Sequence, residues 1–258
     1  MASDPTLRII FDSFMVIFLG TLIIVGIFFI IRAYKIKAKN FYISGIAWMT
    51  IAFAEILNQV FHVPAEFYAI FAKASFILLI VFTNVTFYKG IKIKQKWTLL
   101  ILSLIFAFIG WFVDSMRTSS EISYIVSRII DFILASIALD WLALSCYHTY
   151  KNIKPSSIAP WVKVRYKILY TFSPILTSAY LILIFDPYDV PFGTLEDIRS
   201  FIVYVLVTSL TLIYGISFIL VWMMPKMLKS YLNKEIETGE KEDLNEDEIM
   251  DLVRKELD

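Results

Sequence analysis

Long hydrophobic runs alternate with short polar connections along almost the whole chain, as far as Pro225. A helix needs about 20 apolar residues to cross the hydrocarbon core of a bilayer, and seven runs approach or exceed that length. We therefore expect an all-α polytopic membrane protein with seven transmembrane helices and a rhodopsin-like topology. The expected spans are residues 9–32, 41–61, 67–88, 97–113, 124–147, 168–185 and 198–224.

Composition agrees with this pattern. Apolar residues make up 59% of the chain and charged residues 18%, and the mean hydropathy is +0.71, values typical of membrane proteins. The 258 residues fit one membrane domain, residues 1–225, followed by an acidic tail, residues 226–258. The lipid bilayer is the expected surrounding, and no nucleic-acid partner is expected.

The basic residues are distributed unevenly between the connections. Clusters of lysine and arginine follow the first, third, fifth and seventh spans, whereas the other connections have few bases. Short basic loops stay in the cytoplasm, so we expect a multi-pass protein of the cell membrane with its N-terminus outside and its C-terminus inside. The first three clusters include Arg32, Lys35, Lys37 and Lys39, then Lys89, Lys92, Lys94 and Lys96, then Lys151, Lys154, Lys163, Arg165 and Lys167.

Two ionisable residues lie on either side of the turn His62-Val63-Pro64-Ala65. Glu55 precedes this turn and Lys73 follows it at a similar distance. Charged residues inside a span are costly and commonly functional. If the two helices pack antiparallel, Glu55 and Lys73 stand at similar depth, and we expect them to neutralise each other.

The fifth span adds a second pair. Arg128 and Asp131 are spaced i, i+3, so they share a helix face and are expected to pair directly. Two acids and two bases at one level predict a charge-balanced network open to the outer loops. This network is either an outward-facing pocket for a small polar or zwitterionic ligand, or a set of internal ion pairs that holds the bundle in register. The candidate residues are Glu55, Lys73, Arg128, Asp131, Asn58, Gln59 and Asp12.

Two further positions have candidate roles deeper in the bundle. Asp140, toward the cytoplasmic half of the fifth span, is a possible proton site. Its alternative interpretation is a neutral or hydrogen-bonded acid next to a threonine or serine of a neighbouring helix. Ser173-Pro174 predicts a kink in the sixth span, with Pro174 as a possible hinge.

Several site classes are not expected. The two histidines, His62 and His148, lie near opposite ends of their spans, roughly a membrane thickness apart, so they are not expected to share a haem or a metal ion. The chain has no Gly-x-Ser-x-Gly, His-Glu-x-x-His or phosphate-loop motif, so no enzyme activity is expected. The seventh span has no lysine between Arg199 and Lys226. We therefore expect no retinal Schiff base there, and no other cofactor.

One stretch resembles a known family. The order Trp48, Ala54-Glu55, Pro64, Phe71-Ala72-Lys73, Leu78-Leu79 and Tyr88-Lys89-Gly90 is similar to the seven-helix sensor region at the N-terminus of prokaryotic histidine kinases. The resemblance covers about 45 residues and the overall topology, and it implies a membrane sensory module with Glu55 and Lys73 in its polar core. Prolines expected in the third helix are missing. No dimerisation helix, phospho-acceptor histidine or ATPase domain follows, so the resemblance implies a sensor without the kinase.

The acidic tail contains a predicted amphipathic helix over about residues 246–257. Asn245 and Glu248 have the spacing of a capping box. The apolar residues Ile249, Leu252, Val253 and Leu257 then form one stripe. This stripe is a candidate contact for a cytoplasmic protein partner or for the chain's own basic loops. The alternative is a solvated tail that is helical only part of the time.

Two function classes follow. In the first, which we favour, the protein is a receptor-like sensor that binds a small ligand in the outer pocket and signals through its cytoplasmic loops and tail. In the second, it is a small-solute or proton-coupled transporter that uses Asp131 and Asp140 along a path. A carrier usually has broken helices near the midplane, and only Ser173-Pro174 hints at one.

Overall fold

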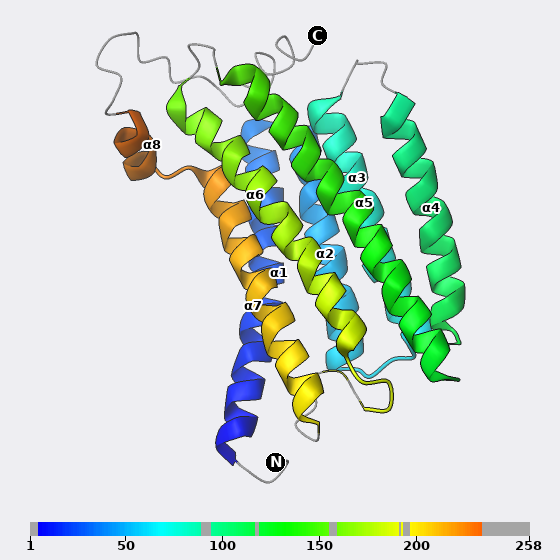
Figure 1. Cartoon of the computed structure of the whole chain (residues 1–258). Coiled ribbons are helices and arrows are strands. Elements are labelled where there is room, and N and C mark those ends of the chain that lie inside the picture. Colours follow the sequence, from blue (N-terminus) through cyan, green and yellow to red (C-terminus); the bar gives the residue numbers. More distant parts are fainter. Residues whose placement is uncertain are drawn as a thin grey trace.

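The computed structural model shows a bundle of antiparallel helices (Figure 1). It describes residues 5–88, 94–116, 119–154, 159–190, 192 and 197–233, and these residues contain no strand. The elements are α1 Pro5–Ile36, α2 Lys39–Gln59, α3 Ala65–Phe87, α4 Lys94–Asp114, α5 Glu121–Ile153, α6 Pro160–Ile182, η1 Leu183–Phe185, α7 Ile198–Met223 and α8 Lys226–Asn233.

Helices α1 to α7 are each long and apolar enough to cross a membrane. Their outward faces carry large apolar side chains that would be unfavourable in water, such as Ile24, Phe108 and Ile216, each more than half exposed. An exposed apolar surface of this extent fits a lipid environment. The all-helical fold and the seven apolar helices that the hydrophobic runs predict are therefore confirmed, and they indicate a multi-pass membrane protein.

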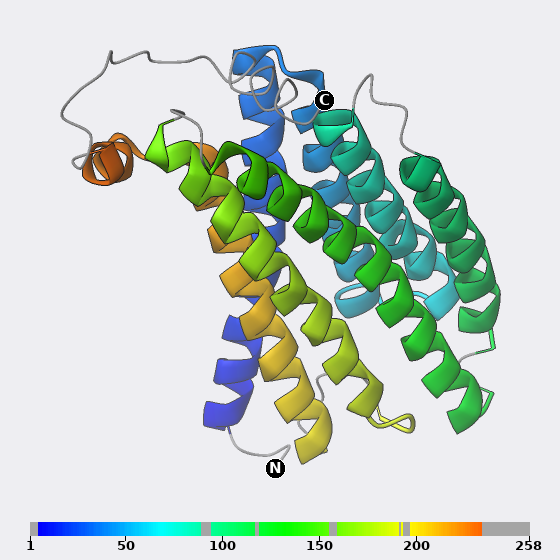
Figure 2. The same ribbon diagram turned by 45° about the horizontal axis from the view of Figure 1, so that its top comes forward.

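Six of these helices enclose a central space, and the seventh lies outside it. Helix α1 packs on α2 and α7, α2 on α3, α3 on α5, α5 on α6, and α6 on α7, which closes the ring. Helix α4 packs on α3 and α5 and lies at the edge of the bundle (Figures 1 and 2). Below, the α2–α3 end means the end where α2 meets α3, and the α1–α2 end means the opposite one.

The helix ends follow local chemistry. Asp197 caps α7 by accepting hydrogen bonds from the backbone N–H groups of Arg199 and Ser200, and these donors lower the pKa of its carboxyl group. Ser120 caps α5 in the same way through the N–H of Ser123. At the end of α7, Met224 adopts a left-handed conformation (φ 34°), which turns the chain into α8.

The elements differ from the expected spans mainly at the α1–α2 end. Helix α5 continues to Ile153 and α6 begins at Pro160, because hydropathy marks the apolar part of a helix and not its polar extension beyond the membrane. Helix α8 was not expected. Helix α6 runs through Pro174 without interruption, and a hinge at this residue stays a prediction. The predicted tail contact at Ile249, Leu252, Val253 and Leu257 lies outside the described residues.

Aromatic side chains fill the interior toward the α1–α2 end. The inner aromatic cluster, as we call it, consists of Phe29, Phe41, Phe82, Phe218 and Trp222, all of which are fully buried. Phe41 and Trp222 meet edge to face with 4.8 Å between ring centroids, and Phe29 and Phe218 lie 5.0 Å apart. Such contacts between rings stabilise the packing beyond the apolar area that they bury. The buried charged residues Lys73, Asp114, Arg128 and Asp186 lie toward the other end of the bundle.

Candidate functional site

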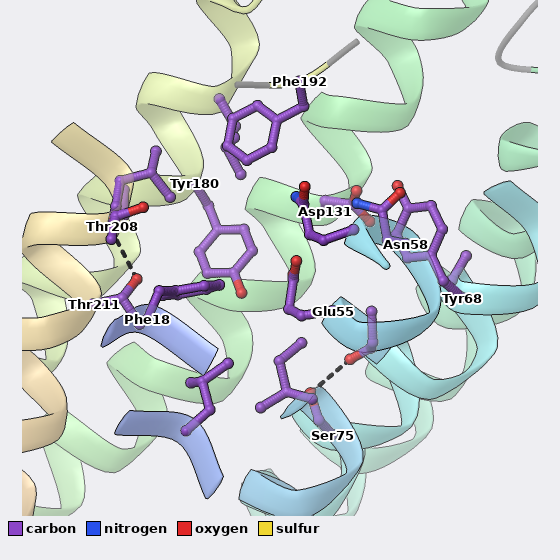
Figure 3. Close-up of a pocket in the computed structure, with 18 of the residues that line it drawn as sticks. Phe18, Glu55, Asn58, Tyr68, Ser75, Asp131, Tyr180, Phe192, Thr208 and Thr211 are labelled. Carbon is purple, nitrogen blue, oxygen red and sulfur yellow. Dashed lines mark hydrogen bonds between the residues drawn. The ribbon is translucent and has the colours of Figure 1, made fainter. Parts of the chain in front are cut away.

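A cavity of about 760 Å³ opens between the helices toward the α2–α3 end (Figure 3). Residues of α1, α2, α3, α5, α6 and α7 line it, and Asp114 at the end of α4 also reaches it. The exposed residues Arg8, Asp12 and His62 are part of the lining, so the cavity extends to the surface at that end. Its volume is in the range of sites for small organic molecules.

All seven residues proposed from the sequence line this one cavity. They are Asp12, Glu55, Asn58, Gln59, Lys73, Arg128 and Asp131. Asp12 is exposed near the mouth, whereas Lys73 and Arg128 are buried. The structure thus brings together side chains from α1, α2, α3 and α5 that are up to 119 positions apart in the sequence, between Asp12 and Asp131.

Lys73 forms two ion pairs, but neither is with Glu55. Its Nζ lies 2.5 Å from Oδ2 of Asp114 and 2.7 Å from Oδ1 of Asp131. Asp114 also accepts a hydrogen bond from the hydroxyl of Ser127 at 2.5 Å. We call Lys73, Asp114 and Asp131 the Lys73 triad. It ties α3 to both α4 and α5.

The expected pair of Glu55 and Lys73 is therefore wrong, and side-chain direction gives the reason. Side chains of a helix lean toward its N-terminus. Lys73, on α3, leans toward the α2–α3 end, while Glu55, on the antiparallel α2, leans the other way. Asp114 is the last residue of α4 and leans back toward Lys73. Equal depth of the Cα atoms does not bring Glu55 and Lys73 into contact.

Arg128 also has a different partner from the one expected. Its Nη2 donates to the hydroxyl of Tyr124 at 3.0 Å and lies 3.4 Å from Oδ2 of Asp186, which follows η1. Asp186 in turn accepts hydrogen bonds from Tyr124 (2.5 Å) and Ser200 (2.9 Å). The expected ion pair of Arg128 with Asp131 is wrong, because the long arginine side chain reaches one turn back along α5 while Asp131 meets Lys73.

Glu55 points into the cavity, with the ring of Tyr180 beside it and Asn58 further along the same wall (Figure 3). Gln59, one turn further along α2, is its neutral neighbour. No lysine, arginine or histidine of the described residues forms an ion pair with it. Its carboxyl group forms a side-chain hydrogen bond with Gln59 and is attracted by the nearby Arg128, and it faces the cavity, where a ligand would contact it.

The two acids that complete these contacts were not among the predicted site residues. Asp114 and Asp186 each come directly after an apolar run, and both were assigned to loops. In the structure they are 2% and 4% exposed, respectively. Their position directly after an apolar run could have identified them, because an acid at the end of a span can turn back into the bundle and pair with an intramembrane base.

Asp140 does not reach the cavity. It lies on the outer surface of α5, where its Oδ1 accepts a hydrogen bond from Thr177 of α6 at 3.0 Å. This contact agrees with the interpretation of Asp140 as an acid hydrogen-bonded to a neighbouring helix, and its role as a proton site stays a prediction. Among the described residues, no group of three or more histidine, cysteine, aspartate or glutamate side chains is placed to hold a metal ion.

Comparisons with protein-family models, curated protein sequences and solved structures found no match to the chain. Function must therefore be inferred from the geometry of the cavity.

Proposed function

We propose that the protein is a receptor-like membrane sensor that binds a small ligand in the central cavity and signals at the opposite end of the bundle. The observation that carries this proposal is the cavity itself, into which charged side chains from several helices project. Ionisable residues are retained inside membrane domains mainly where they pair with one another or serve a function. Here Glu55 has no ion-pair partner among the described residues, which favours a functional role.

The proposed orientation follows from the basic clusters. Lysines and arginines of the helix ends gather at the α1–α2 end, for example Lys35 of α1, Lys96 of α4 and Lys163 of α6, and the cavity reaches the other end. Basic connections stay in the cytoplasm. The cavity mouth would then face outward from the cell membrane, and the ends of α5, α6 and α8 at the α1–α2 end would face the cytoplasm.

The walls of the cavity provide a route for coupling. A ligand there would contact helices that also meet in the inner aromatic cluster, because α1, α2, α3 and α7 contribute to both. Closely packed rings transmit a helix displacement, since such interiors hardly compress. The similarity of the Trp48–Gly90 stretch to sensor regions of histidine kinases points in the same direction, and it is an analogy of sequence alone.

Transport is the second candidate, and the inner aromatic cluster weighs against it. Trp48 and Tyr214 stack at the deep end of the cavity with 5.9 Å between ring centroids, and Tyr214 stacks on Phe218 of the cluster at 5.4 Å. A solute would have to cross these rings to reach the α1–α2 end. Asp140, the second acid of the transport hypothesis, is not in the cavity.

The first experiment is a thermal-stability screen of the purified protein in detergent against amines, amino acids, organic acids and lipids. A ligand that binds the folded state raises the melting temperature by mass action. We expect a ligand that stabilises the wild type and the Glu121→Gln variant but not Glu55→Gln. Glu121 is an exposed acid of α5 outside the cavity, so this control removes the same charge. Absence of any stabilising ligand would contradict the proposal.

A second experiment separates sensing from transport. Cys146 is the only cysteine and is fully buried, so a Cys146→Ala background accepts spin labels at chosen sites. Labels at Tyr34→Cys and Met227→Cys report on exposed positions of α1 and α8. For a sensor, the ligand changes the distance between the labels and does not cross proteoliposomes. Flux of the ligand with no change in distance would favour transport.

A further inference from the structure

The buried charges around the cavity do not balance. The Lys73 triad has two carboxylates for one base, and Arg128 is paired with Asp186. Glu55 adds a further carboxyl group that forms no ion pair with a base of the described residues, although Arg128 attracts it from nearby. Two bases thus face four carboxyl groups, a formal excess of two negative charges when all six groups are ionised, whereas a neutral network was expected.

We propose that the ligand of this cavity is an organic cation, an amine or quaternary ammonium compound whose charged group binds at Glu55. This inference rests on the proposed function and names the class of ligand. Charges in a low-dielectric interior interact strongly, so the excess of carboxylates favours a positively charged ligand. A zwitterion, which the sequence analysis considered, would leave the excess unchanged, and an anion would increase it.

The two bases of the network are already engaged. Lys73 Nζ contacts two carboxylates at 2.5 Å and 2.7 Å, and the Nη2 atom of Arg128 is taken by Tyr124 and Asp186. All hydrogen bonds of Arg128 are made by Nη2, and its buried Nε lacks a hydrogen-bond partner. A guanidinium holds a carboxylate at two points through Nη2 together with either Nη1 or Nε, so a ligand carboxylate would have to compete with Tyr124 and Asp186 for Nη2.

Aromatic side chains provide the second element of cation recognition. Trp48, Tyr68, Tyr180 and Tyr214 all line the cavity that Glu55 enters, and Tyr68 and Tyr180 stand on different sides of it (Figure 3). The faces of aromatic rings attract ammonium groups, and several such rings together bind quaternary ammonium compounds. A cavity of about 760 Å³ also leaves room for the organic part of the ligand, against its apolar walls.

The surroundings of the mouth favour the same charge. Among the described residues near the α2–α3 end, the acids Asp12, Glu66, Glu121, Asp189 and Asp197 outnumber the bases Arg8 and Arg199, of which Arg199 pairs with Asp197 at 3.5 Å. Acidic groups around an opening raise the local concentration of cations and their rate of entry.

The test uses four compounds that share a phenylethyl or benzyl skeleton and differ in charge. They are 2-phenylethylamine (cation), phenylalanine (zwitterion), 2-phenylethanol (neutral) and phenylacetate (anion), titrated calorimetrically into the full-length protein in detergent. We expect the amine to bind and the other three to bind at least tenfold more weakly. The Glu55→Gln variant should lose roughly tenfold to a hundredfold in amine affinity, because a charged hydrogen bond is lost. Glu121→Gln should bind as the wild type does.

The outcomes separate this inference from the proposed function. Equal or tighter binding of phenylalanine or phenylacetate would overturn the cation assignment and leave the sensor proposal standing. So would amine binding that Glu55→Gln leaves unchanged. If the four compounds do not bind but another class stabilises the protein in the wider screen, the cation assignment is wrong. If nothing in either experiment binds, both proposals fail.

Discussion

Replacing Lys73 by methionine should destabilise the protein strongly, because it leaves Asp114 and Asp131 without their common base. At the 2.7 Å that separates Nζ from Asp131, two unit charges attract by about 6 kcal/mol at an effective dielectric constant near 20. Desolvation of the ammonium group offsets much of this attraction. Breaking a buried ion pair on one side nevertheless costs about 3–5 kcal/mol in measured cases, and we expect Lys73→Met to fall in that range.

The two acids of the Lys73 triad differ in exposure, so the cost of replacing them should also differ. The side chain of Asp131 is 19% exposed and that of Asp114 only 1%. Asp131→Asn leaves Lys73 paired with Asp114 and should cost about 1–2 kcal/mol, close to one hydrogen bond with a charged group. The triple variant, in which Lys73→Met is combined with Asp114→Asn and Asp131→Asn, removes every charge of the triad. It should regain at least half of the loss, because no buried carboxylate is left unpaired.

The assay is reversible unfolding in mixed micelles, with the fraction folded followed by tryptophan fluorescence and circular dichroism. A triple variant no more stable than Lys73→Met would refute this reasoning. So would a cost of Lys73→Met below about 1 kcal/mol, the level of a solvent-exposed ion pair.

Three further substitutions test other features. Gly110→Ala should cost about 1–3 kcal/mol in the same unfolding assay, because a Cβ there would collide with the Lys73 side chain, whereas Gly20→Ala, with no atom within 4 Å of its Cβ, should be neutral or stabilising. Arg165→Met should cost about 2 kcal/mol and change the fluorescence of Trp161 and Trp222, whose ring centroids lie 5.0 and 5.1 Å from the guanidinium carbon of Arg165. Unchanged fluorescence and stability would contradict that packing. Asp197→Ala should lower the melting temperature at pH 7, and the difference from the wild type should shrink as the pH falls below 3.8 through the lowered pKa of Asp197, since a lowered pKa stabilises the fold only while the carboxylate is ionised; a difference that persists at low pH would show that the carboxylate charge is not what matters.

Apolar length was enough to predict the helices and to select charged residues that line one cavity. The seven runs correspond to seven helices, and Glu55, Lys73 and Arg128 line one cavity. Both results depend on one dimension only, the position along the membrane normal, which follows from counting residues at a fixed rise per residue.

The partners of these residues could not be predicted from depth. Pairing also depends on how each helix is rotated about its axis and on the direction in which its side chains lean. Depth alone includes neither of these. Lys73 therefore meets Asp114 instead of Glu55, and Arg128 meets Asp186 instead of Asp131. Both unforeseen acids directly follow an apolar run. At such a position, tertiary packing decides whether the side chain lies in the loop or inside the bundle.

The Lys73 triad also constrains how the protein is made. Lys73 precedes Asp114 by 41 residues and Asp131 by 58, so the ribosome delivers α3 with its ammonium group well before either counter-ion exists. Until α4 and α5 follow, that charge has to remain near the interface or beside the insertion machinery, because an unpaired ammonium group in lipid is unfavourable. The triad thus favours insertion of α3, α4 and α5 as one unit, and α4, which lines the cavity only through Asp114, supplies the first counter-ion of Lys73.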